Sequence, residues 1–314
     1  MSIGTFKVAY LSATVALIAG CNAITPPQSA FPEPVSLAHM EPSWIDPAAK
    51  GEALVYVTNR RTGEINILSF PQGVPVGAIS GFEEPEGECV DAAGDVFVTD
   101  SKTAQVTVFA HGGVVPIRTL SYPRAQPFDC SIDPATGNLA VSNRLFSRKP
   151  HSVVAIYAAA KGSPKTYEHA AFQTEYCGYD NHGNLFLDGS DHRTEMAELP
   201  KGSSTIVNVT LNQPIASQGT IQWDGQYVAV TSTREAIVYR ILFNGRHGKI
   251  VGSTSLAGGV SVTHSWIRGD KILGPDNYVY VWPYPSGGDP IRRYDGFAEP
   301  MDAVVTEPRE VHRT

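Results

Sequence analysis

The chain has 314 residues, of which 42% are hydrophobic, so it can bury a substantial core. Gly (29) and Pro (23) are abundant and only 18% of the residues are charged, a mixture typical of many short strands joined by tight turns. The formal net charge of −7 argues against nucleic acid as a partner, because nucleic-acid binding needs clustered Lys and Arg.

The first 20 residues have the pattern of an export signal. Lys7 precedes an apolar run, Val8–Ala19, which is too short to span a bilayer comfortably but has the length of a signal-peptide core. The run ends in Ile18-Ala19-Gly20-Cys21, which resembles the bacterial lipobox. That resemblance implies cleavage before Cys21 and lipidation of Cys21 with several acyl chains, enough for stable anchoring. The alternative is an ordinary signal peptide followed by a chance cysteine.

Residues 21–51 are expected to form a tether between the membrane and a folded domain. They hold six prolines and no periodic apolar pattern, a composition typical of extended linkers. By resemblance to lipoprotein sorting rules, Asn22 favours the outer membrane over retention at the inner one. We therefore expect a lipid-anchored protein of the cell envelope, on its periplasmic or extracellular face.

A repeat begins after the tether. The segment Pro85–Asp91 is followed by a turn at Gly94 and by a short apolar strand, Val96–Asp100. Similar segments start at Pro127, Thr174, Gln218 and Val262. Each of them starts 42, 47, 44 and 44 residues, respectively, after the start of the segment before it. Fixed periods of 40–50 residues indicate propellers or other repeat arrays.

Each repeat unit can be divided into four strands. A Gly-containing turn follows every third strand, as at Gly73 and Gly112, and glycine supplies the positive φ that hairpin turns require. The first unit begins at Ala53 with a second strand, whereas residues 299–306, at the other end, match first strands. We therefore predict an all-β, six-bladed β-propeller over residues 52–307, with residues 308–314 as a tail. The C-terminal strand completes the first blade and closes the ring, so we expect a monomer.

The repeat also carries a family resemblance. It resembles the NHL-type six-bladed propellers and, more narrowly, a group of uncharacterised bacterial lipoproteins. The segments that carry the resemblance are Pro85–Asp100, Pro127–Asn143, Glu175–Asp188, Gln222–Gly225 and Tyr284–Gly288. The resemblance implies a fold but hardly a function, because propellers host unrelated activities.

Polar residues gather where the first strands begin, near the central opening of the ring. This candidate ligand-binding set consists of Glu86, Glu88, Asp129, Glu175, Tyr176, His264 and Asp302. In the repeat alignment, Asp129, Tyr176, His264 and Asp302 share one position. Carboxylates around one mouth could bind Ca²⁺ or another divalent metal; the alternative is a solvated mouth without a ligand.

Two other sets of side chains have simpler interpretations. Acidic residues that end first strands are expected to cap turn amides: Asp91, Asp133, Asp180 and Asp224. Cys130 and Cys177 share a repeat position and Cys89 lies one residue later, so strand alternation could bring Cys89 opposite Cys130. Export favours a disulfide there, and three buried thiols are the alternative.

The leading functional interpretation is a non-catalytic binding or interaction module. Its partner would be a protein, a glycan or a small ligand held at one mouth of the channel. The alternative is a metal-dependent hydrolase of lactones or esters, since lactonase-like propellers hold a divalent metal in the channel. That family's signature segments are absent, as are a Gly-x-Ser-x-Gly elbow and a zinc-type histidine spacing, and we assign no catalytic residue.

Overall fold

The computed structural model describes residues 42–309, apart from residues 123–124, 145–151, 170–171 and 191–193. The predicted signal peptide, Cys21 and most of the predicted tether lie outside the described residues. The described chain is built of short antiparallel strands with two 3₁₀ helices, η1 (Pro47–Gly51) and η2 (Ala158–Ala160). Neither of these helices has the length and apolarity that crossing a membrane would require.

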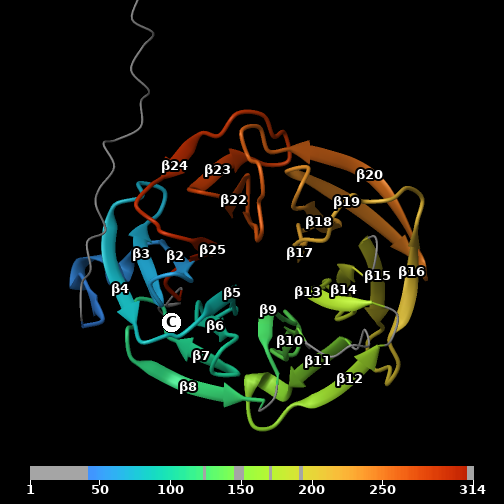
Figure 1. Ribbon diagram of the computed structural model, residues 1–314, viewed down its shortest axis with the longest axis horizontal. Coiled ribbons are helices and arrows are strands. Elements are labelled where there is room, and N and C mark those ends of the chain that lie inside the picture. Colours follow the sequence, from blue (N-terminus) through green and yellow to red (C-terminus); the bar gives the residue numbers. More distant parts are fainter. Residues whose placement is uncertain (1–41, 123–124, 145–151, 170–171, 191–193, 310–314) are drawn as a thin grey trace, which may run out of the picture. The chain divides into compact units, whose positions relative to one another are not determined.

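Within the described residues, the strands form six four-stranded meanders arranged around a central axis, which we call blades one to six (Figure 1). Two of the blades are joined into one eight-stranded sheet by a parallel pair between outer strands. From the inner to the outer strand, blade one is β25 (Pro300–Thr306), β2 (Leu54–Asn59), β3 (Glu64–Ser69) and β4 (Pro75–Ser80). Blade two is β5 (Pro85–Val90), β6 (Val96–Asp100), β7 (Gln105–Phe109) and β8 (Pro116–Ser121).

The remaining blades follow in chain order. Blade three is β9 (Pro127–Ile132), β10 (Leu139–Asn143), β11 (Ser152–Tyr157) and β12 (Lys165–His169). Blade four is β13 (Gln173–Tyr179), β14 (Leu185–Ser190), β15 (Thr194–Leu199) and β16 (Val207–Leu211). Blade five is β17 (Ile221–Trp223), β18 (Val228–Ser232), β19 (Ile237–Asn244) and β20 (His247–Ser255). Blade six is β21 (Trp266–Arg268), β22 (Lys271–Pro275), β23 (Val279–Pro283) and β24 (Arg292–Tyr294).

The ring closes as the sequence predicts. β25, the last strand of the chain, pairs antiparallel with β2, the first long strand, from Leu54–Thr306 to Asn59–Pro300. Apolar side chains of the strands fill the spaces between neighbouring blades, where they form six buried clusters. One cluster joins Val55 and Val57 of blade one to Leu273 and Val281 of blade six, so closure is by packing as well as by hydrogen bonds.

The folded part begins before residue 52. β1 (Trp44–Ile45) adds a short fifth strand to the outer edge of blade one by pairing with β4. η1 follows it, with the Asp46 carboxylate accepting a hydrogen bond from Ala48 N and with Ala49 buried against the core. The last residues of the predicted tether therefore belong to the propeller, where they cover an edge that would otherwise expose unpaired backbone groups.

The turn residues behave as expected at the ends of the inner strands. Asp91 accepts hydrogen bonds from Ala93 N and Asp95 N, and Asp180 accepts them from His182 N and Asn184 N. Asp133 and Asp224 cap the corresponding turns. These four carboxylates stabilise turns, which confirms the prediction.

A disulfide joins the inner strands of blades two and three. Cys89 on β5 and Cys130 on β9 are bonded, with their Cα atoms 5.7 Å apart. The register accounts for this pair: Cys130 and Cys177 are equivalent positions and Cys89 lies one residue later, so its side chain faces the next blade. Cys177 is a buried free thiol whose pKa is raised by burial, which leaves it protonated and unreactive.

Candidate functional site at the mouth of the channel

The inner strands of blades one to four each carry a β-bulge near their first residue. The extra residue is Met301 in β25, Glu86 in β5, Phe128 in β9 and Glu175 in β13. A bulge re-aims side chains, and bulges are common beside functional sites. The sequence pattern does not reveal them, because a single inserted residue changes the register without changing the apolar alternation that follows.

Hydroxyl groups of the preceding blade hold these bulges in place. Thr58 of β2 donates a hydrogen bond of 2.7 Å to the carbonyl of Glu86, and Ser142 of β10 donates one of 2.6 Å to that of Glu175. Thr99 of β6 reaches the carbonyl of Phe128 in the same way, at 3.2 Å. Thr263 donates a hydrogen bond of 3.0 Å to the carbonyl of Met301, so a hydroxyl of the preceding blade holds each of the four bulges.

Two arginines neutralise the outer carboxylates of the mouth. Arg60, directly after β2, lies 3.4 Å from Glu86 and also pairs with Glu299. Arg144, directly after β10, lies 3.4 Å from Glu175, so each arginine reaches the bulge of the next blade. The sequence interpretation missed both; the signal was the Asn-Arg pair that ends two of the second strands.

These contacts change the electrostatics expected for the mouth. Gln218 donates a hydrogen bond of 2.9 Å to Glu175, and the Arg144 guanidinium lies 3.4 Å from the centroid of the Phe128 ring. Burial raises the pKa of Glu86, although Arg60 acts in the opposite direction. The rim of the mouth is therefore a set of paired charges over an aromatic ring rather than a ring of repelling carboxylates.

Three aromatic side chains lie beneath the rim. Phe128, Tyr176 and His264 contact one another pairwise, with ring centroids 5.0 to 5.3 Å apart. All three are buried, and burial raises the pKa of Tyr176. His264 lies just before β21, at the strand position of Asp129 and Asp302. Ser265 N donates a hydrogen bond to the Thr220 hydroxyl of the preceding blade, as Cys177 N does to the Asp129 carboxylate. The repeat alignment, which gives His264 and Asp129 the same position, is confirmed.

The deepest part of the mouth is a cluster of Asp129, His264 and Asp302. One carboxylate oxygen of each aspartate and one ring nitrogen of His264 lie within 4.8 Å of one another. The carboxylate of Asp129 accepts a hydrogen bond from Cys177 N, and that of Asp302 accepts hydrogen bonds from Glu88 N and Ala303 N. Each aspartate thereby also binds its inner strand to the next one.

Burial sets the protonation of this cluster. It raises the pKa of Asp129 and raises that of Asp302 to about 7. It lowers the pKa of His264 to about 3, with Arg144 and Arg60 acting in the same direction, so the imidazole is neutral.

The seven predicted residues thus fall into separate environments. Asp129, His264 and Asp302 come together, with Tyr176 packed beside them, whereas Glu86 and Glu175 are held by arginines. Glu88 is equivalent to Cys130 and Cys177, so its side chain lies on the opposite face of its strand from the position of Asp129. The pKa of Glu88 is raised by burial and by the charge of Asp302.

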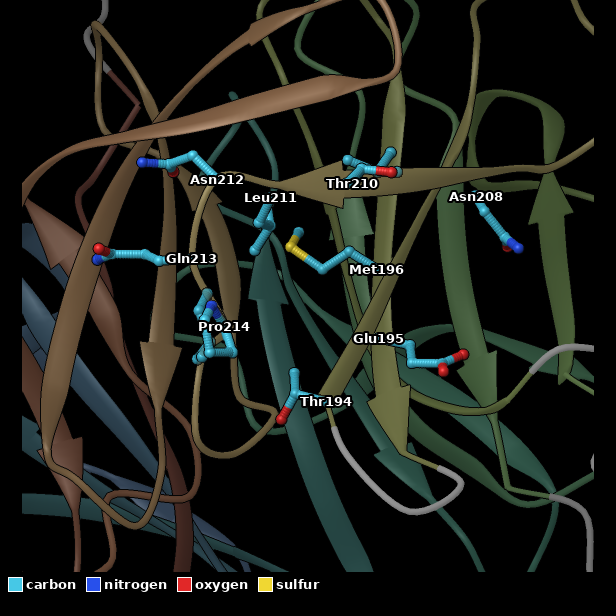
Figure 2. A pocket seen from close by; sticks show the side chains of 11 residues that line it. Thr194, Glu195, Met196, Asn208, Thr210, Leu211, Asn212, Gln213 and Pro214 are labelled. Carbon is cyan, nitrogen blue, oxygen red and sulfur yellow. The ribbon is translucent and has the colours of Figure 1, made fainter.

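Pockets lie beyond the rim on the described part of the molecule as well. One of about 190 Å³ lies between the inner strands: Glu88 and Asp302 line it, together with Tyr179, Trp223 and Trp266 at the far ends of the strands. A larger one, of about 500 Å³, lies on the outer side of blade four between β15, β16 and the segment that follows β16 (Figure 2). Its labelled side chains are mostly uncharged polar or apolar groups and do not converge on one point as the mouth residues do.

Comparisons with known proteins support the fold alone. No protein-family model matches the chain, and no curated protein matches its sequence. Among solved structures, a chain in a crystal structure of a nidogen/laminin complex superposes with a TM-score of 0.64 at 10% identity, covering 81% of this chain and 98% of that one. A protein of unknown function from Bacteroides caccae superposes with a TM-score of 0.62 at 12% identity, covering 81% and 99%.

The fold is therefore an all-β propeller. The NHL family and the lipoprotein group remain predictions from the sequence.

Proposed function

We propose that this protein is an exported, lipid-anchored binding module of the cell envelope that takes a polar ligand at the mouth of its propeller. The observation that supports ligand binding is the construction of the rim. Arg60 and Arg144 are each 30% exposed at the side chain, and each is oriented by a carboxylate from the next blade. A guanidinium has five N–H donors, so donors remain for a ligand that presents carboxylate or hydroxyl oxygens.

The anchoring part of the proposal rests on the lipobox resemblance at Cys21 and is tested separately. In Cys21→Ser, the chain should lose its acyl chains and move from the membrane to the soluble fraction. The same mass and the same membrane partitioning in the variant would contradict lipidation.

The binding part is tested on the full chain in detergent. Thermal unfolding is followed with members of three ligand classes: dicarboxylates, amino acids and short oligosaccharides. We expect at least one class to raise the melting temperature in proportion to the logarithm of its concentration. Arg144→Gln should abolish that rise. Arg268→Gln, which removes an exposed ion pair with Glu307 at the other end of an inner strand, should leave it intact. Equal responses in both variants would refute a site at the mouth.

A metal-dependent hydrolase is the second candidate, favoured by the cluster of Asp129, His264 and Asp302. A bound divalent ion could polarise an ester carbonyl or activate water. All three residues are no more than 3% exposed, behind aromatic rings, which keeps substrates away from them. Hydrolysis of a nitrophenyl ester that is metal-dependent and lost in Asp129→Asn would favour this function over simple binding.

A further inference from the structure

We propose that Asp129, His264 and Asp302 form a site for one first-row transition-metal ion of the Zn²⁺ type, bound across the axis of the propeller. This goes beyond ligand binding at the rim and does not depend on it.

The first argument is the tautomer of His264 and the free nitrogen that it leaves. Its Nδ1 lies 2.9 Å from the carbonyl oxygen of Met301, which can only accept, so Nδ1 carries the proton. Nε2 then has a lone pair, and it is buried without a hydrogen-bond partner. A buried imidazole with one nitrogen bound to a backbone carbonyl and the other free is the usual arrangement of a metal-binding histidine.

The second argument is the convergence of anionic ligands on that imidazole. The three donor atoms lie within 4.8 Å of one another, and ligand atoms around a tetrahedral Zn²⁺ are about 3.3 Å apart, as follows from bond lengths of about 2.0–2.1 Å. Binding an ion therefore requires side-chain rotations that bring the three donor atoms closer together. The backbone hydrogen bonds of Asp129 and Asp302 orient their carboxylates and leave lone pairs for an ion.

The third argument is the glycine that lets the two aspartates approach. Gly87 occupies the position of β5 that is equivalent to Asp129 and Asp302, between the strands that carry them. A Cβ at this position would lie 2.6 Å from the Phe128 carbonyl oxygen and 2.9 Å from the Asp129 Cα. Any side chain there would displace Asp129 from the cluster.

The donor set selects the class of metal. One imidazole nitrogen and two carboxylates suit Zn²⁺ or its first-row neighbours and leave a coordination position open. Ca²⁺ prefers six to eight oxygen ligands, and Glu86 and Glu175, which could have supplied more, are paired with arginines. The ion would link blades one, three and six.

The test measures metal binding by the full chain, purified in detergent and stripped with a chelator. After dialysis against Zn²⁺, elemental analysis should give one tightly bound equivalent and the melting temperature should rise, whereas Ca²⁺ at the same concentration should do neither. Asp129→Asn can still accept a hydrogen bond from Cys177 N, and it should weaken Zn²⁺ binding by more than about tenfold.

The matched control is Asp188→Asn. Asp188 is also buried and accepts a backbone hydrogen bond, from Gly219 N, but it is not one of the three clustered residues. This variant should bind Zn²⁺ as the original chain does. If Asp129→Asn fails to fold, X-ray absorption of the Zn²⁺-loaded original chain decides, since a nitrogen ligand must be present. No stoichiometric Zn²⁺, equal binding by Asp129→Asn, or an ion without a nitrogen ligand would overturn the proposal.

Discussion

Asp129 lies within the inner strand β9 and Asp133 directly follows that strand; both are buried, yet they are held in different ways. Asp133 is satisfied within its own turn, by Ala135 N and the Thr136 hydroxyl. Asp129 receives its hydrogen bond from Cys177 in the next blade and lies beside another carboxylate and a neutral imidazole. A buried carboxylate therefore indicates a ligand-binding site only where groups from several blades converge and still have lone pairs free for a ligand.

The largest effect is expected when the mouth loses a whole strand. Deleting residues 299–314 removes β25 and Asp302 but leaves the turn at Asp133 intact. β2 then has no inner partner and the core cluster between blades six and one is opened, so the cooperative thermal transition should disappear. Deletion of residues 310–314 is the control and should not change the melting temperature. A cooperative transition at the original temperature in the longer deletion would refute closure.

The disulfide between two mouth strands should have the next largest effect. Cys89 and Cys130 are 41 residues apart, and a loop of that size implies a stabilisation of about 3–4 kcal/mol. Replacing both cysteines by alanine should lower the free energy of unfolding by this amount in denaturant titrations. Reductant should destabilise the original chain in the same way and have no further effect on the variant. Unchanged midpoints in both experiments would rule out the bond.

The protonation of the mouth predicts that the stability of the chain depends on pH. Because burial raises the pKa of Asp302 to about 7, the folded chain keeps a proton that the unfolded carboxyl, with its ordinary pKa of about 3.9, releases. The stabilising contribution of this group is complete below about pH 4 and is lost as the pH rises through 7. From pH 4 to 8, Asp302→Asn should therefore gain stability relative to the original chain.

The matched control for this pH effect is Tyr176→Phe. It changes the same mouth without removing a group that titrates in this range, since burial raises the pKa of Tyr176 above its ordinary value near 10. Its stability difference from the original chain should be the same at pH 4 and pH 8. If Asp302→Asn behaved in the same way, the carboxyl of Asp302 would have no raised pKa.

The smallest effect is expected at the turn. Asp133→Ala removes the acceptor of Ala135 N and the Thr136 hydroxyl and should cost about 1 kcal/mol. Asp133→Asn should recover most of that loss, because an amide oxygen can accept the same bonds. Neither variant should alter metal or ligand binding. A binding defect in either would remove the distinction between turn and mouth carboxylates.

The sequence predicts the strands, the turns and ring closure well, because each depends on local patterns repeated in every blade. Asp91 and its equivalents lie next to a glycine turn, and their role follows from that spacing. The mouth is harder to predict because it depends on bulges that shift the register by one residue. The partners of Glu86 and Glu175 therefore could not be derived from the alignment. The Cys89–Cys130 bond was one of two alternatives, which strand alternation alone could not resolve.

The most direct measurement of the mouth is nitrogen NMR of His264 in the chelator-treated protein. A long-range proton–nitrogen correlation distinguishes the two ring nitrogens and their protonation. The structure predicts a neutral imidazole at pH 7 with the proton on Nδ1 and an unprotonated Nε2, which titrates only near pH 3. The Nε2 signal should move when one equivalent of Zn²⁺ is added. A protonated Nε2 at pH 7, or an Nε2 signal whose chemical shift does not change when Zn²⁺ is added, would contradict the account of this site.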